Sequence, residues 1–252
     1  MDGRDGKIIR VENVSTTYEG EKRPAIRGVN LALENGELVY LVGPNAAGKT
    51  TLLETINGLQ PVSKGEVSVL GLDVRGHGSV VRKEIGYVPQ DFMVEALEPY
   101  TALDVAMMGR YAKMGVLRRP EKEDFKKAME ALGLLGVEEL ACKPVGKLSG
   151  GQQQKVMISR ALAKEPKVLL LDEPFSNLDP SSRQEVSALV CRLNEERKMA
   201  TIVVTHDIRQ IPERCRRIVV MNGGRIVADE SPEKALAALE SCQNIGAEEA
   251  VP

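Results

Sequence analysis

The sequence predicts an α/β fold that is interrupted by a helical insertion. Short apolar runs typical of strands alternate with helical segments in the first 90 residues and again after residue 164. Between residues 91 and 164 there is no convincing strand pattern, and apolar residues recur at helical spacing. A chain of 252 residues is long enough to bury a core for this arrangement, as one large domain or two small ones.

The first 90 residues contain one strand that is expected to be buried on both faces. Leu38–Val42 is a continuous apolar run, which is typical of such a strand. It ends in a Gly-rich loop, after which we expect a helix from about Lys49 to near Gly58. Alternating or short apolar patterns predict further strands at Ile8–Val14, Ile26–Leu33, Glu66–Leu70 and Ile85–Val88.

The helical stretch contains one segment with a clear amphipathic pattern. Phe125, Ala128, Met129 and Leu132 are spaced i, i+3, i+4, i+7, and Gly133 stands where it could end the helix. This spacing predicts a helix with one apolar face.

After residue 164 the strand pattern returns. Val168–Leu171 is a second buried strand, and Asn222-Gly223-Gly224 predicts a hairpin turn. Ser231 and Pro232 are typical of an N-cap and the first residue of a helix, and the last ten or so residues are expected to fray. Other strands are expected at Thr201–Thr205, Ile218–Met221 and Arg225–Ala228, and a helix is expected with the apolar face Val186, Leu189, Val190 and Leu193.

The composition argues against several functional classes. Lys and Arg number 34 against 36 Asp and Glu, a net charge of −2, which disfavours a protein that coats duplex nucleic acid. Aromatic residues make up 3%, too few for a binder that stacks single-stranded bases. The longest apolar runs have five residues, too short for a membrane span, and the N-terminus lacks a secretory apolar region. The four cysteines form no CxxC, which indicates free thiols in a reducing cytoplasm.

A phosphate-binding loop is predicted between the first buried strand and the helix that follows it. The segment Gly43-Pro44-Asn45-Ala46-Ala47-Gly48-Lys49-Thr50 fits G-x-x-x-x-G-K-[ST] in the required strand–loop–helix context. Small residues let backbone amides approach phosphate oxygens, and the start of the helix directs its positive dipole end at the same anions. Lys49 adds a charge near the β- and γ-phosphates, and the Thr50 hydroxyl can bind Mg²⁺. The alternative is a Gly-rich turn without a ligand.

Two carboxylates follow the second buried strand. Asp172 and Glu173 come directly after Val168–Leu171. Because ligands of open α/β sheets lie outside the carboxyl ends of the strands, we expect Asp172 beside the phosphate loop, where it can hold Mg²⁺. Glu173 could orient and deprotonate an attacking water. The alternative is a simple acidic exit from a strand.

The segment Leu148-Ser149-Gly150-Gly151-Gln152 is the most specific motif. Ser149 and Gln152 have the spacing of a capping box at a helix N-terminus. That structural role leaves two glycines in the first turn unexplained, since each weakens a helix by roughly 1 kcal/mol. Exposed amides that can approach a phosphate closely would explain them.

With this segment the sequence resembles the nucleotide-binding subunits of ABC transporters, whose signature is LSGGQ, over about residues 8 to 240. The resemblance implies a P-loop NTPase core of RecA-like type with an N-terminal antiparallel β subdomain and an inserted helical subdomain. It places the core and β subdomain at 1–89 plus 165–252, and the helical subdomain at 90–164. It implies an ATPase that uses ATP and Mg²⁺ as cofactors.

The resemblance also implies roles for individual residues. Tyr18 stands where the family stacks an aromatic ring on adenine, and Gln90 where the family has the glutamine that touches Mg²⁺ and the attacking water. Ser176-Asn177-Leu178-Asp179 resembles the family's D-loop, and His206 its switch histidine near the γ-phosphate. The implied nucleotide-binding residues are Tyr18, Gly43, Pro44, Asn45, Ala46, Ala47, Gly48, Lys49, Thr50 and Thr51, with Ser149, Gly150, Gly151, Gln152 and Asp179 acting from the partner subunit. The implied catalytic residues are Glu173, His206 and Gln90, and the implied metal ligands are Thr50, Gln90 and Asp172.

Each of these residues also has a structural alternative. Tyr18 could be an ordinary core or surface tyrosine, and His206 a hydrogen-bonded structural histidine. Asp179 before Pro180 is also a good N-cap. The loop departs from the family at Ala46, where the family usually has Gly. If that position needs φ > 0, Ala costs about 1 kcal/mol or somewhat more, and we still expect ATP to bind.

The resemblance implies a homodimer in which two subunits face head to tail with ATP between the phosphate loop of one and the signature of the other. Its implied partners are integral membrane permease subunits and, indirectly, a solute-binding protein, with no nucleic acid. The chain would then lie in the cytoplasm, peripheral on the cytoplasmic face of the membrane.

The cargo has only weak signals. Met108–Tyr111, Leu117–Pro120 and Gly151–Lys155 are similar to subunits that import metal ions, zinc or manganese especially, and to importers of iron chelates. We therefore expect an importer of metal ions or metal chelates. Another cargo, or a non-transport ATPase of the iron–sulfur cluster assembly type, is the alternative.

Overall fold

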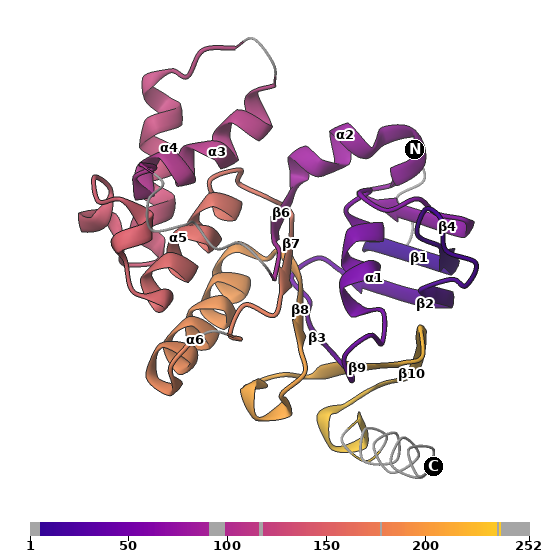
Figure 1. Ribbon diagram of the computed structural model, residues 1–252. Coiled ribbons are helices and arrows are strands. Elements are labelled where there is room, and N and C mark those ends of the chain that lie inside the picture. The colour runs from indigo at the N-terminus through magenta and orange to yellow at the C-terminus, as the bar shows by residue number, and fades with distance from the viewer. Residues whose placement is uncertain (1–5, 91–98, 116–117, 177, 236, 238–252) are drawn as a thin grey trace.

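The computed structural model describes residues 6–90, 99–115, 118–176, 178–235 and 237. Two β-sheets and a group of helices form three regions of the molecule (Figure 1). A six-stranded sheet stands in the middle, a four-stranded sheet lies on the side of α1, and α3, α4, α5 and α6 lie on the other side.

The strands build one antiparallel and one mostly parallel sheet. The antiparallel sheet has the order β2-β1-β4-β5 and the larger sheet the order β10-β9-β3-β8-β7-β6. The strands are β1 (Lys7–Thr16), β2 (Ile26–Glu34), β3 (Leu38–Val42), β4 (Lys64–Val69), β5 (Leu72–Asp73), β6 (Ile85–Val88), β7 (Val168–Asp172), β8 (Ala200–Thr205), β9 (Arg217–Asn222) and β10 (Arg225–Glu230). In the larger sheet β6, β7, β8, β3 and β9 run parallel, and β10 returns antiparallel to β9.

The helices are α1 (Lys49–Ile56), α2 (Val74–Glu84), α3 (Ala102–Met114), α4 (Lys122–Leu134), α5 (Gly150–Leu162) and α6 (Pro180–Arg197). Short 3₁₀ turns are η1 (Glu138–Leu140), η2 (Val145–Lys147) and η3 (Ile208–Gln210).

The central sheet is covered on both faces, because alternate side chains of each strand enter different cores. Tyr40 and Val42 of β3 pack with the cluster that includes the helices α3, α4, α5 and α6. Val39 and Leu41 of the same strand pack with α1 and the antiparallel sheet. The expected burial of β3 and β7 on both faces is confirmed, since four of five β3 residues and all β7 residues are buried.

Most of the expected elements are present within one or two residues of their predicted ends, including the hairpin of β9 and β10. The prediction for α4 was partly wrong. Ala128 and Leu132 are buried, but Phe125 and Met129 are 44% and 36% exposed. The helix also continues past Gly133 to Leu134, and the left-handed glycine after it is Gly136 with φ +64°.

α2 and β5 were not expected from the sequence. α2 contains two glycines and is bent at His77, whose φ of −127° and ψ of 20° are not helical. Low helix propensity hides such a helix from an amphipathic search, although Asp73 caps its N-terminus by accepting a hydrogen bond from the Arg75 amide at 2.9 Å.

In the part of the chain that the structure describes, no helix has the length and apolar character needed to cross a membrane. The expected fraying of the last ten residues concerns residues outside the described ranges.

Candidate functional site

The loop between β3 and α1 is tightly fitted to its neighbours. A Cβ on Gly43 would lie 2.1 Å from the Met221 carbonyl oxygen, and a Cβ on Gly48 would lie 2.9 Å from the Ala25 carbonyl oxygen. Gly48 also has φ +95°, which favours glycine. The hairpin after β9 supports the loop from outside, because the Gly224 amide donates to the Ala47 carbonyl at 3.1 Å.

Ala46 adopts the left-handed conformation, with φ +61°. Because an alanine is strained in this conformation, Ala46 costs about 1 kcal/mol relative to the glycine that the family usually has here. The side chain is exposed, so that no packing contact opposes the extra methyl group.

Lys49, the first residue of α1, is buried within this loop. Its ammonium donates to the carbonyl oxygens of Gly43 and Pro44, each at 2.9 Å. Burial lowers the pKa of Lys49, while the nearby carboxylates of Glu173 and Asp172 act in the opposite direction. The lysine therefore ties the loop together and keeps a positive charge within it.

The N-terminus of α1 has amides that no side chain caps. Gly48 is the N-cap residue and makes no side-chain hydrogen bond to the helix. Amides in this position, together with the helix dipole, form an anion-binding site. Tyr18 reaches the same turn, where its hydroxyl lies 2.9 Å from the Thr51 hydroxyl oxygen.

Asp172 is a buried carboxylate without a hydrogen-bond partner among the described residues. Its exposed fraction is 1%, and both carboxylate oxygens lack a partner. Burial raises the pKa of Asp172 to about 6; the adjacent Thr50 hydroxyl and Lys49 only partly offset this rise. Two orphaned oxygens beside a threonine hydroxyl are the hard donors that Mg²⁺ prefers, so these residues fit that ion.

Glu173 and His206 form a pair. The Glu173 Oε2 atom lies 2.9 Å from His206 Nδ1, and the two side chains are 9% and 49% exposed. Glu173 has φ +46°, an uncommon conformation for a residue with a side chain and one that recurs at functional sites. Its amide donates to Val204 at 3.1 Å, which fixes this turn between β7 and β8.

The loop, Tyr18 and Glu173 border one cavity of about 390 Å³, and Asp172 and His206 are not among its lining residues. Four separate segments of the chain meet there, and the lining residues are Tyr18, Ala25, Asn45, Ala46, Ala47, Gly48, Lys49, Thr50, Thr51, Gln90 and Glu173. Sequence reasoning missed Ala25, which contacts the loop through its backbone and carries no chemical signal of its own.

The segment Ser149–Gln152 does not line this cavity, although it forms the predicted capping box. The Ser149 hydroxyl accepts from the Gln152 amide at 3.3 Å, and Gln152 Oε1 accepts from the Ser149 amide at 3.1 Å. Gly151 is buried, and a Cβ there would meet Ser182 Oγ at 2.7 Å, which gives this glycine a packing reason as well. Gly150 is exposed.

The predicted N-cap role of Asp179 is confirmed, since its side chain accepts from the amides of Ser181 and Ser182 at 3.0 and 3.1 Å. Asn177 of the same segment lies outside the described residues.

Together the glycine-bounded loop, the uncapped helix start and the orphaned aspartate define a phosphate-binding α/β protein of the P-loop NTPase class. A profile of the family described as "ABC transporter" matches residues 26–176. The chain belongs to the ABC transporter family, as an ATPase subunit with the nucleotide-binding cassette fold.

Curated relatives agree with this assignment. The chain is 38% identical over 201 residues to the manganese transport system ATP-binding protein MntB of Bacillus subtilis (strain 168), covering 80% of this chain and 78% of that protein. It is 39% identical over 224 residues to the sulfate/thiosulfate import ATP-binding protein CysA of Pseudomonas syringae pv. tomato, covering 89% of this chain and 67% of that protein.

Among solved structures, the chain resembles the dimeric, post-hydrolysis ATP-binding cassette MJ0796 bound to ADP and phosphate. The identity is 32% and the TM-score 0.75, covering 88% of this chain and 98% of that chain. Cassettes of this family thus form dimers and bind the products of ATP hydrolysis.

Proposed function

We propose that this subunit hydrolyses ATP to drive the import of a metal ion, manganese or zinc, through separate membrane permease subunits. The observation that carries the ATPase assignment is the buried, unpartnered carboxylate of Asp172 beside the phosphate loop. The metal cargo is supported by the similarity to a manganese transport protein. We also propose the division into a core at 1–89 plus 165–252 and a helical subdomain at 90–164.

The phosphates of ATP would be held by the loop Gly43–Thr51. The amides at the start of α1 have no side-chain cap among the described residues, so they can donate to phosphate oxygens. Lys49 would exchange one of its two loop carbonyls for the β- or γ-phosphate. Tyr18 would stack on adenine, since it already borders the cavity.

Asp172, Thr50 and Gln90 would hold the Mg²⁺ ion. When bound, this ion neutralises charge that develops on the phosphates. Asp172 is suited to this because its oxygens have no protein hydrogen bond to give up. Thr50 and Gln90 both border the same cavity.

Glu173 would act as the general base. Its carboxylate would take a proton from water while the water oxygen attacks the γ-phosphorus, the bond to ADP breaks, and phosphate leaves. His206 would hold the Glu173 carboxylate in place, since its Nδ1 atom lies 2.9 Å from that carboxylate. In this arrangement His206 orients the base and borders the γ-phosphate.

The signature Ser149–Gln152 would complete the site of a second subunit, with Asp179, in a head-to-tail homodimer. This would give the exposed Gly150 amide at the start of α5 a phosphate to bind. The permease subunits would hold the dimer against the cytoplasmic face of the membrane, and a solute-binding protein would deliver the cargo.

A sulfate importer is the second candidate, because the similarity to the sulfate/thiosulfate subunit is equally high at 39%. An ATPase of the iron–sulfur cluster assembly type would instead have soluble partners.

The substitution Glu173→Gln tests the ATPase proposal. We expect ATP binding to persist, an ATP-dependent dimer to accumulate, and turnover to fall by roughly 10²- to 10⁴-fold. Size-exclusion chromatography and phosphate release measure these effects. Glu185→Gln is the matched control, an exposed glutamate on α6 that should keep wild-type turnover. Wild-type turnover by Glu173→Gln would refute Glu173 as the base.

The cargo is tested with the complex. The chain should co-purify with a multi-span permease, and vesicles that contain both should accumulate Mn²⁺ or Zn²⁺ when ATP is supplied on the cassette side. Sulfate uptake would favour the second candidate, and co-purification with soluble partners alone would refute a transport role.

A further inference from the structure

β6 is the edge strand of the central sheet in the described part of the chain, and side chains satisfy its free edge. The strand pairs with β7 on one side. On the other, Lys164 donates to the Ile85 carbonyl at 3.0 Å and Arg160 donates to the Tyr87 carbonyl at 3.3 Å. Two cations thus take the place of a neighbouring strand.

The two donors come from the last turn of α5 and from just beyond it. Arg160 lies within α5, which ends at Leu162, and Lys164 lies two residues past that end. Their acceptors, the carbonyls of Ile85 and Tyr87, are two residues apart in β6, about 6.6 Å. Lys164 also donates to the Arg82 carbonyl at 3.2 Å, in the last turn of α2. The end of α5 is therefore bonded to both α2 and β6.

This joint concentrates positive charge. Burial lowers the pKa of Lys164 to about 8, and Arg160, Arg82 and Lys113 act in the same direction. Burial also lowers the pKa of Arg160. Half-buried cations that repel each other are unfavourable unless acceptors compensate them. The backbone carbonyls of α2 and β6 supply that compensation, so the cations hold a defined geometry.

The joint connects two parts of the proposed ATPase machinery. α5 begins at the signature segment, and Tyr87 stands three residues before Gln90. Val88 pairs with Leu171, the residue before Asp172. The packing is close, because a Cβ on Gly86 would lie 3.0 Å from the Ala161 carbonyl oxygen.

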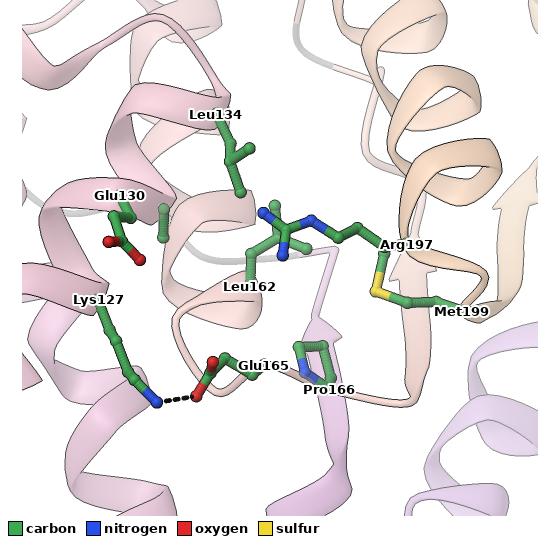
Figure 2. Close-up of a pocket in the computed structure, with 9 residues that line it drawn as sticks. Lys127, Glu130, Leu134, Leu162, Glu165, Pro166, Arg197 and Met199 are labelled. Carbon is green, nitrogen blue, oxygen red and sulfur yellow. Dashed lines mark hydrogen bonds and ion pairs between the residues drawn. The ribbon is translucent and has the colours of Figure 1, made fainter.

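The end of α5 borders a cavity on its side toward α4 and α6. A cavity of about 220 Å³ separates α4 and the end of α5 from the end of α6 (Figure 2). Lys127 and Glu165 form an ion pair of 2.6 Å at its rim, while Arg197 from α6 extends above Leu162 (Figure 2). The contacts with β6 and α2 thus hold the end of α5 on the side of the sheet, while Arg110 of α3 donates to the Ala163 carbonyl at 2.8 Å on the side of the helices.

We propose that Arg160 and Lys164 are positioning residues for ATP hydrolysis, which hold the strand that leads to Gln90 against the end of the signature helix. They act through Gln90 and touch neither ATP nor Mg²⁺. The inference rests on the roles proposed above for Gln90 and the signature.

The substitutions Arg160→Met and Lys164→Met remove the donors but keep an unbranched, flexible apolar side chain. We expect kcat to fall about 10- to 100-fold, because Gln90 is misplaced, while KM for ATP stays within about twofold. The Mg²⁺ concentration that gives half-maximal activity should rise. Arg160→Lys keeps a donor and should recover part of the kcat. Steady-state ATPase assays with titrated Mg²⁺ measure all three quantities.

Lys155→Met is the matched control. Lys155 lies on the same helix, but its ammonium pairs with Glu185 of α6 at 2.6 Å instead of contacting β6. It should keep wild-type kcat and Mg²⁺ dependence. If the Met variants do not fold, Gly86→Ala and Arg160→Lys test the inference instead. We then expect kcat to fall in Gly86→Ala and to fall less in Arg160→Lys, while KM for ATP is unchanged in both.

This inference would be overturned if the Arg160→Met and Lys164→Met variants kept wild-type kcat and Mg²⁺ dependence. If those variants do not fold, wild-type kcat and Mg²⁺ dependence in Gly86→Ala would overturn it. So would losses that Lys155→Met shares equally. Absence of ATPase activity in the wild-type protein would instead refute the proposed function.

Discussion

Two buried aspartates show how the architecture and the site differ. Asp124 in α4 and Asp172 at the end of β7 are 5% and 1% exposed. Asp124 accepts from the Arg110 guanidinium at 2.9 and 3.1 Å and from the Glu121 amide at 3.0 Å. Both carboxylate oxygens of Asp172 lack a hydrogen-bond partner within the geometric limits among the described residues.

The pKa values of the two carboxyl groups shift in opposite directions. The Glu121 amide and Arg110 lower the pKa of Asp124, whereas burial raises the pKa of Asp172 to about 6. Asp124 thus stabilises the packing of α3 and α4, while Asp172 destabilises the fold until a ligand completes it. A buried carboxylate marks a functional site when it is unpaired.

The largest expected effect is on activity, from Asp172→Asn. Removal of a metal ligand should lower Mg²⁺-dependent turnover on the order of 1000-fold, since the metal supplies several kcal/mol of transition-state stabilisation. The unfolding free energy without Mg²⁺ should stay equal or rise. ATPase assays and urea denaturation measure the two effects. A marked loss of stability would show that Asp172 is a structural residue like Asp124.

Asp124→Ala should show the reverse pattern. It removes the carboxylate closest to buried Arg110, which keeps only the more exposed Glu165 at 3.3 Å, and should destabilise the protein by roughly 3 kcal/mol. Turnover per folded molecule, measured at low temperature, should change little. Glu123→Ala, an exposed residue of the same helix, is the control and should cost less than about 0.5 kcal/mol. Equal losses of unfolding free energy in both variants would mean that the buried pair of Asp124 and Arg110 contributes no more to stability than an exposed residue.

The two aspartates also predict opposite pH dependences. The folded-state pKa of Asp172 lies near 6, above its ordinary value of 3.8, so the folded protein binds the extra proton. Without Mg²⁺, stability from this group should fall as pH rises from about 4 to about 6, by up to about 3 kcal/mol. The contribution of Asp124 is present above its ordinary pKa and is lost as pH falls. Denaturation of wild type and Asp172→Asn across this range measures the difference, and identical slopes would contradict the assignment.

The smallest effect concerns Ala46. Ala46→Gly relieves the left-handed backbone and should stabilise the protein by about 0.5–1 kcal/mol, because the relief exceeds the entropy cost of glycine. Ala47→Gly is the control; Ala47 is buried without a positive φ and should be destabilised. ATP should bind to both wild type and Ala46→Gly by calorimetry. Binding only in the glycine variant would contradict our expectation that this loop is functional.

Much of this architecture could be predicted from local patterns. The strands β3 and β7 are continuous apolar runs, and the phosphate loop is a contiguous motif in a fixed context. α2 could not be predicted because two glycines lower its helix propensity and it bends at His77. The exposure of Phe125 and Met129 depends on which helices pack on α4.

The sheet topology allowed the position of Asp172 beside the phosphate loop to be predicted, but other contacts between distant segments could not be. The proximity of Ala25 to the loop and the hydrogen bond between Tyr18 and Thr51 depend on tertiary structure. The segment Met108–Tyr111 suggested a metal cargo. The presence of Arg110 in this segment also has a structural explanation, because Arg110 donates to the Ala163 carbonyl at 2.8 Å just after the end of α5.

The most direct test of the account is the thermal stabilisation by ATP with and without Mg²⁺, compared between wild type and Asp172→Asn. The account predicts that Mg²⁺ raises the melting temperature of the ATP-bound wild type and adds nothing to ATP-bound Asp172→Asn, which is at least as stable without ligand. An equal Mg²⁺-dependent rise in both proteins would contradict the claim that the orphaned carboxylate of Asp172 holds the metal.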